Sequence, residues 1–180
     1  MIKFKKIAFL AMTTLALSAC GGGTSTIDTP PAIDAAPPHI KASVDGTMVT
    51  ATTGLEGIRN TVLNMAWLFG RTPVTEPSGS QSYWSIESLK PVVGIYKCDG
   101  STNLDNLQIG LYQRTDLGDG YFQTYGKPAS KCEVRVLAVS VTEISGTFTA
   151  TLVRSGDDSA VVQVQNGTFR MPLVEGEGPK

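Results

Sequence analysis

The stretch ISGTFTATL, residues 144–152, alternates apolar or small residues with serine and threonine at every second position. Successive side chains of a β-strand point to opposite sides of the sheet, so this alternation predicts a strand with one apolar and one hydroxyl-rich face. A strand of this kind is typical of an antiparallel sheet that packs one face against a core and exposes the other.

The sequence on both sides of this stretch continues the same pattern. Residues 134–140 (VRVLAVS) alternate, and residues 161–165 and 168–171 form two strand-like runs around Asn166-Gly167. Asn-Gly is a common signal for a type I′ hairpin, although it also fits a bulge inside one continuous strand. Pro172 then indicates a strand end or a sheet edge.

The first half of the domain gives a less regular pattern. Residues 40–50 are predicted as a strand with a turn at Asp45-Gly46, and residues 61–69 as a second strand. Helical spacing over residues 55–69, with a possible capping box at Thr53 and Glu56, is the alternative for that region. Short strand-like runs also occupy residues 83–88, 92–97, 107–113 and 120–125. The prediction is an all-β fold, an antiparallel β-sandwich or barrel-like domain.

The N-terminus has the features of an export signal. Three lysines within the first six residues precede a short apolar run at residues 7–17. At about 1.5 Å per helical residue this run is too short to cross a hydrocarbon core about 30 Å thick. The export segment ends at Leu17-Ser18-Ala19-Cys20, which resembles the lipobox of bacterial lipoproteins. That resemblance implies a signal peptide over residues 1–19 and attachment of diacylglycerol to Cys20.

The same resemblance also implies where in the cell the protein is held. Stable anchoring requires two or more acyl chains, which lipidation of Cys20 would supply. Gly21 stands where an aspartate would favour inner-membrane retention, so we expect a lipid-anchored protein of the cell envelope, in the outer membrane if the organism has one. Residues 20–38 are rich in glycine and proline and are predicted to be a disordered tether, and residues 39–180 a single domain.

Three short motifs of the domain resemble small β-rich lipoprotein domains of unknown function. They are Val93-Gly94-Ile95-Tyr96, Ile144-Ser145-Gly146-Thr147-Phe148 and Asn166-Gly167-Thr168-Phe169. This resemblance implies a β architecture across residues 40–173 and no particular activity.

Composition excludes some partners and predicts one covalent link. Loss of residues 1–19 removes three of 15 basic residues and none of 16 acidic ones, which leaves a net charge of about −4. Such a chain lacks the basic patch that nucleic acid requires.

Cys98 and Cys132 form an even pair in an exported chain, so a disulfide is predicted, with free thiols or a redox pair as alternatives.

Candidate binding residues are few. Tyr121 and Tyr125 are predicted to share one strand face, where they could contact a sugar or a partner or form part of the core. Residues 99–105 imitate the start of a calcium loop, but Leu104 and Gly110 break the pattern, so a polar turn is expected. His39 is the only histidine and is expected to be an ordinary surface residue.

No catalytic motif stands out, and no cofactor or metal is expected. The sequence therefore predicts a non-enzymatic envelope module that binds a protein or a glycan, or serves a structural role. A small carboxylate-dependent carbohydrate-active enzyme and an accessory subunit of an envelope complex are the alternatives.

Overall fold

The computed structural model describes residues 36–75, 79–98, 100, 106–115 and 118–178, and within these ranges it contains strands and no helix. No helix in the described residues is long and apolar enough to span a membrane. The strands are β1 (His39–Val44), β2 (Thr47–Ala51), β3 (Thr53–Asn60), β4 (Met65–Arg71), β5 (Gln81–Leu89), β6 (Gly94–Cys98), β7 (Gln108–Thr115), β8 (Gly118–Gln123), β9 (Lys131–Val139), β10 (Glu143–Arg154), β11 (Asp157–Pro172) and β12 (Val174–Glu175).

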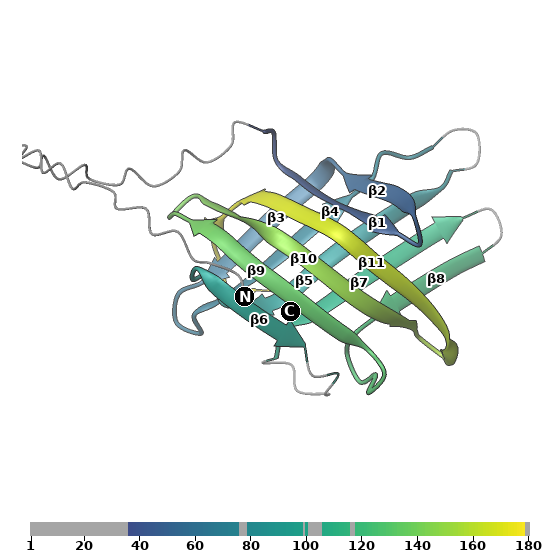
Figure 1. Ribbon diagram of the computed structural model, residues 1–180. Helices are drawn as coiled ribbons and strands as arrows, with labels where there is room; N and C mark the ends of the chain where they lie inside the picture. The colour runs from purple at the N-terminus through teal and green to yellow at the C-terminus, as the bar shows by residue number, and fades with distance from the viewer. Residues whose placement is uncertain (1–35, 76–78, 99, 101–105, 116–117, 179–180) are drawn as a thin grey trace, which may run out of the picture. The chain divides into compact units, whose positions relative to one another are not determined.

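One continuous hydrogen-bonded sheet folds into two layers (Figure 1). β10 pairs with β11 along one edge, and along the other it pairs first with β9 and then, at Val153 and Arg154, with β8. One layer therefore contains β6, β9, β10, β11, β1 and β2, and the other contains β12, β3, β4, β5, β7 and β8. The path ends at β12 and β2 without closing into a barrel, and the prediction of an all-β, sandwich-like fold is confirmed.

The core lies between the two layers. Trp84 of β5 is fully buried and meets Phe148 of β10 edge to face, with ring centroids 5.6 Å apart. Phe148 in turn lies 6.5 Å from Phe169 of β11. These contacts join the layers through aromatic side chains, which bury large apolar areas and prefer such tilted arrangements.

The alternation in residues 144–152 is realised as expected in β10. Ile144, Phe148 and Leu152 are buried, whereas Thr149 is exposed. Gly146 is buried too, and a Cβ at this position would lie 2.2 Å from the carbonyl oxygen of Arg135. The glycine therefore permits a close approach of β9 to β10.

The hairpin interpretation of Asn166-Gly167 is wrong, and the bulge interpretation is correct. β11 runs without interruption through both residues, and its register with β10 shifts between Phe148 and Ala150. Asn166 has a φ of 52°, a left-handed conformation that asparagine tolerates better than most residues. The bulge bends one long strand instead of reversing the chain.

The strand predicted at residues 61–69 is partly wrong. Residues 61–64 form the turn between β3 and β4, and only Met65 onward is strand. The side chain of Asn60 accepts a 2.8 Å hydrogen bond from the backbone N–H of Leu63, and Asn64 has a φ of 53°. This local turn chemistry outweighs the apolar alternation and leaves Val62 91% exposed. The helical alternative is also excluded.

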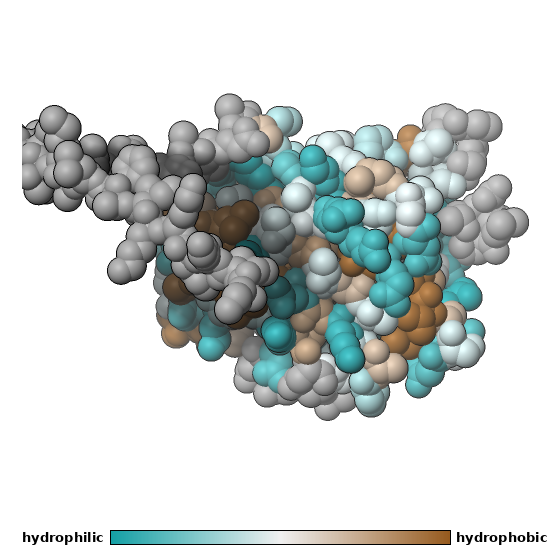
Figure 2. Space-filling model, viewed as in Figure 1, coloured by the Kyte–Doolittle hydropathy of each residue, from teal (hydrophilic) through white to brown (hydrophobic). Residues whose placement is uncertain are grey.

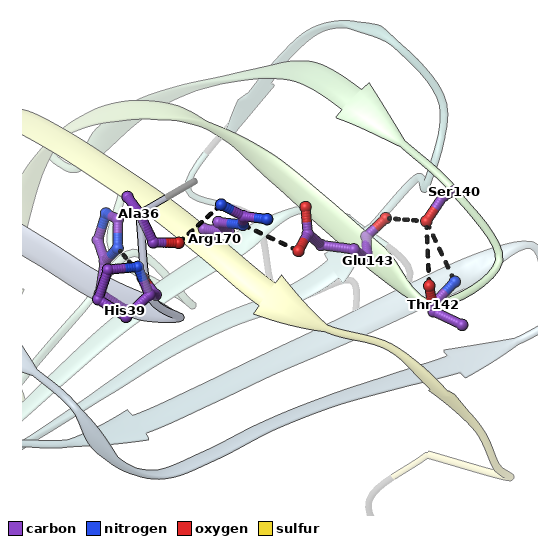
Figure 3. Close-up of polar contacts among 7 residues, drawn as sticks. Ala36, His39, Ser140, Thr142, Glu143 and Arg170 are labelled. Carbon is purple, nitrogen blue, oxygen red and sulfur yellow. Dashed lines mark hydrogen bonds and ion pairs between the residues drawn. The ribbon is translucent and has the colours of Figure 1, made fainter. Parts of the chain in front are cut away.

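A polar network at one end of β11 reaches residues that the sequence places in the tether (Figure 3). Arg170 donates a 2.8 Å hydrogen bond to Glu143 of β10 and a 2.7 Å hydrogen bond to the backbone carbonyl of Ala36. His39 makes hydrogen bonds to the carbonyl of Pro37 and to the hydroxyl of Thr168, so it has a structural role at this end of the sheet. The folded part thus includes residues before His39.

Candidate functional site

A row of three tyrosines crosses the outer face of the layer that contains β5, β7 and β8. Tyr83 of β5 is the register partner of Tyr112 of β7, and Tyr112 is the register partner of Tyr121 of β8. Register partners point to the same side of a sheet with Cβ atoms roughly 4.5–5.5 Å apart. We call Tyr83, Tyr112 and Tyr121 the tyrosine row.

Strand alternation places the tyrosine row outside the core. Each tyrosine has a chain neighbour that points inward, namely Trp84, Leu111 and Phe122. Trp84 and Leu111 are fully buried. Since successive side chains alternate between faces, the tyrosines must point away from the core. The phenol rings pack on the sheet while part of each remains open to solvent, and Tyr121 is 39% exposed.

Two small residues make space beside the row. Ser85 and Gly110 are register partners on the outer face. A Cβ at Gly110 would lie 2.6 Å from the Ser85 hydroxyl and 2.9 Å from the Tyr121 hydroxyl. The glycine therefore lets the Tyr121 phenol lean over β7, which any larger residue would prevent.

Two arginines, Arg71 and Arg114, lie beside the tyrosine row. The guanidinium carbon of Arg71 lies 5.7 Å from the centroid of the Tyr83 ring, and Tyr83 also stacks on Phe69 at 6.0 Å. Arg114 follows Tyr112 by two positions and lies on the same face of β7. No described carboxylate lies within ion-pair distance of either arginine, and the four ion pairs of the described chain involve other residues.

A shallow pocket opens where these groups meet. It has a volume of about 320 Å³ and is lined by Arg71, Gln81, Ser82, Tyr83, Tyr112 and Arg114. A neighbouring hollow shares Gln81, Ser82 and Arg114 with the pocket and continues toward Met48 of β2. The lining therefore combines aromatic rings, an amide and two guanidinium groups, which can bind a polar ligand by stacking and hydrogen bonding.

The phenols of the row stay protonated over the ordinary pH range. Burial first, and the charge of Glu87 second, raise the pKa of Tyr83 to about 12. The same two causes raise the pKa of Tyr121. The pKa of Tyr112 is raised because its hydroxyl donates a hydrogen bond to the Asp119 carboxylate. The row is thus uncharged and retains hydroxyl groups that can donate and accept hydrogen bonds.

The structure separates the two tyrosines that the sequence paired. Tyr121 lies in the tyrosine row, but β8 ends at Gln123, and Tyr125 lies in the turn that follows. The expectation of one shared strand face is therefore wrong. Sequence analysis missed Arg71, Tyr83, Tyr112 and Arg114, because nothing in a single strand says which neighbour it pairs with.

The two domain cysteines are joined by a disulfide. Cys98 of β6 and Cys132 of β9 are register partners, with Cα atoms 4.9 Å apart. This agrees with the predicted pair and places the link at an end of the opposite layer. Cys20 and the acidic positions of the calcium-like stretch, Asp99 and Asp105, lie outside the described residues, and no group of three or more metal-binding side chains occurs in the described part.

The outer face of the layer with β9, β10 and β11 has a different character. Figure 2 shows hydrophilic and near-neutral residues gathered over β10 and β11. Two hollows of about 470 and 380 Å³ lie here, lined mainly by threonine, glutamine, lysine, arginine and glutamate side chains. No tyrosine lines either hollow, whereas Tyr83 and Tyr112 line the pocket on the opposite face.

Comparison with known proteins gives no relative from which a role could be transferred: no family model, no curated protein and no solved structure matches this chain.

Proposed function

We propose that this protein is a lipid-anchored lipoprotein of the cell envelope whose domain is a non-enzymatic binding module. The observation that carries the binding role is the pocket of Arg71, Tyr83, Tyr112 and Arg114 on an otherwise ordinary β-sandwich. An envelope module held by an N-terminal lipid meets glycans and other envelope components at the surface it exposes. The lipobox-like Leu17-Ser18-Ala19-Cys20 supports the anchoring role.

The lining of the pocket favours binding over hydrolysis. Carboxylate-dependent glycosidases use two carboxyl groups that flank the scissile bond, roughly 5–10 Å apart. The described lining residues of this pocket include two guanidinium groups and no carboxylic acid. Tyrosine rings and guanidinium groups bind and orient a ligand, and the carboxylate that accepts the Tyr112 hydrogen bond, Asp119, does not line the pocket.

Binding is tested with the full-length protein purified in detergent and envelope polysaccharide isolated from the same cells. We expect the wild-type protein to be retained, and the Tyr112→Ala variant to lose about 10-fold or more in affinity, because stacking area is lost. Tyr125→Ala is the matched control, since it removes an equal side chain from the turn outside the face. Equal retention of both variants would contradict the proposed binding face.

Anchoring is tested separately by metabolic labelling with an alkyne fatty acid. Wild-type protein is expected to take up label and sediment with membranes, while Cys20→Ala takes up none. In cells with two membranes, Gly21→Asp is expected to move the protein from outer to inner membrane. A wild-type protein without label would contradict the lipoprotein assignment and leave the binding result unaffected.

A strip of exposed apolar residues favours a second candidate, an accessory subunit of an envelope complex. Val92, Val93 and Ile95 lie at or just before β6, and Leu137 lies in its partner β9, with more than half of each side chain exposed. Apolar patches on one face often mark protein contacts. A partner that crosslinks to wild-type protein in a fixed ratio and is lost in Ile95→Asp would support this role, and unchanged crosslinking would exclude it.

A further inference from the structure

We infer that the pocket beside the tyrosine row binds a carboxylated oligosaccharide, with Tyr83 and Tyr112 under the sugar rings and Arg71 and Arg114 on the carboxylate groups. This inference rests on the proposed binding function and deepens it by naming the ligand class.

The two guanidinium groups of the pocket favour an acidic ligand. A guanidinium carries a full positive charge and five donors at every physiological pH, and it matches a carboxylate in a two-point arrangement. Inside the fold, Arg170 binds a carboxylate through one of its donors, since its Nε lies 2.8 Å from Glu143 Oε2. Arg71 and Arg114 line the pocket without a described carboxylate partner, so an acidic group of a ligand would supply the carboxylate that they lack.

The other charges of this face are arranged consistently with that assignment. Glu87 lies four residues along β5 from Tyr83, on the side of the row opposite Gln81 and Arg114. Glu56 pairs with Phe69, two residues before Arg71. Asp119 is the register partner of Arg114, without forming an ion pair with it, and accepts the hydrogen bond of the Tyr112 hydroxyl. None of these carboxylates lines the pocket, whereas Arg71 and Arg114 do, so the pocket itself presents positive charge to a ligand.

The tyrosine rings of the pocket favour a sugar. Sugar rings present C–H groups that pack on aromatic faces and hydroxyls that require hydrogen-bond partners, and Tyr, Gln and Ser supply both. The pocket and the hollow beside it share Gln81, Ser82 and Arg114, and their volumes of about 320 and 450 Å³ exceed what one small acid needs. The continuous surface suits a chain of several sugar units.

The ligand is therefore assigned by two independent features of the surface. Guanidinium groups without a carboxylate partner among the described residues select negative charge, and the tyrosine rings select a sugar ring that presents an apolar C–H face. A polyuronate chain, in which each sugar unit carries a carboxylate, has both properties in every repeat.

The test uses the full-length protein in detergent and two probes with the same sugar chain, one carrying free carboxylates and the other carrying uncharged methyl esters. The first is an oligogalacturonate of six units, and the second is the same oligomer with all its carboxylates methyl-esterified. Titration calorimetry is expected to show binding of the acid and at least about 10-fold weaker binding of the ester. Loss of one charged hydrogen-bonding pair suffices for a change of that size.

Single arginine substitutions test which side chains bind the carboxylate groups of the probe. Arg71→Gln and Arg114→Gln are each expected to weaken binding of the acid by about 10-fold or more while leaving binding of the ester unchanged. Arg135→Gln is the matched control, because Arg135 is an exposed arginine on β9 in the opposite layer. Thermal unfolding of each variant shows that the domain remains folded.

Each outcome decides a different claim. Equal binding of acid and ester would overturn the acidic-ligand inference and leave the proposed binding face in place. Binding of neither probe would overturn the inference, while retention by envelope polysaccharide would still decide the proposed function. Acid binding that Arg135→Gln weakens as much as Arg71→Gln does would show that binding depends on overall positive charge and would overturn the inference.

Discussion

Arg71 holds its guanidinium carbon 5.7 Å from the centre of the Tyr83 ring, and no described carboxylate lies within ion-pair distance of it. The contact orients the cation along the aromatic surface and leaves its donors available to a ligand. The arginine and the tyrosine are register partners on β4 and β5, so the sheet itself fixes their arrangement.

The raised pKa of Tyr83 makes stability depend on pH in the alkaline range. In the folded protein this pKa is about 12, whereas an unfolded tyrosine ionises near 10. The stabilising contribution is present below about pH 10 and is lost as the pH rises toward 12, because the unfolded state releases the proton first. We expect the urea midpoint of Tyr83→Phe to fall less steeply than that of wild type over this interval. Tyr125→Phe controls for the general loss of a phenol, and equal slopes for Tyr83→Phe and wild type would contradict the prediction.

Reduction of the Cys98–Cys132 disulfide should destabilise the domain. The link closes a loop between residues 34 positions apart, which corresponds to about 3–4 kcal/mol in the chain-entropy model. We expect urea unfolding of the Cys98→Ser/Cys132→Ser variant to show a loss of this order, and reduced wild type to match it. Intact mass before and after alkylation checks the link directly, and two thiols that react without prior reduction would count against it.

Gly146 should tolerate no side chain. A Cβ there would lie 2.2 Å from the Arg135 carbonyl oxygen and 2.6 Å from the Phe169 ring. Gly146→Ala is expected to cost at least about 1–3 kcal/mol in unfolding free energy, because backbone and a buried ring must both move. Gly46→Asn is the control, since Gly46 has open space around it and a positive φ that asparagine tolerates. A Gly146→Ala protein as stable as wild type would show that β9 and β10 can separate freely.

The pairing of Arg170 with Glu143 should matter more than a surface ion pair. Both side chains are about four-fifths buried, and Arg170 also binds the Ala36 carbonyl (Figure 3). Arg170→Met would leave the Glu143 carboxylate without its partner, and we expect a loss of about 1–3 kcal/mol by urea unfolding. The double variant with Glu143→Gln should recover part of that loss, and strictly additive effects would argue against coupling.

The alternation of apolar and polar residues was enough to predict an all-β fold, because every second side chain along most of β10 is buried. It failed at residues 61–64, where the turn bonds of Asn60 outweigh an apolar pattern, and at Asn166, where the same dipeptide suits a hairpin and a bulge. The tyrosine row shows a further limit. Tyr83 and Tyr112 each lie in a predicted strand, but their meeting depends on strand order, which long-range pairing determines.

The most direct test of the binding face is a map of backbone amide chemical shifts during titration with the oligogalacturonate probe. The account predicts that the shifts concentrate at Arg71, Tyr83, Tyr112 and Arg114, while the outer face of β9, β10 and β11 stays unchanged. Shifts centred instead on the threonine- and glutamine-rich hollows of that opposite face, or no shifts at saturating probe, would contradict it.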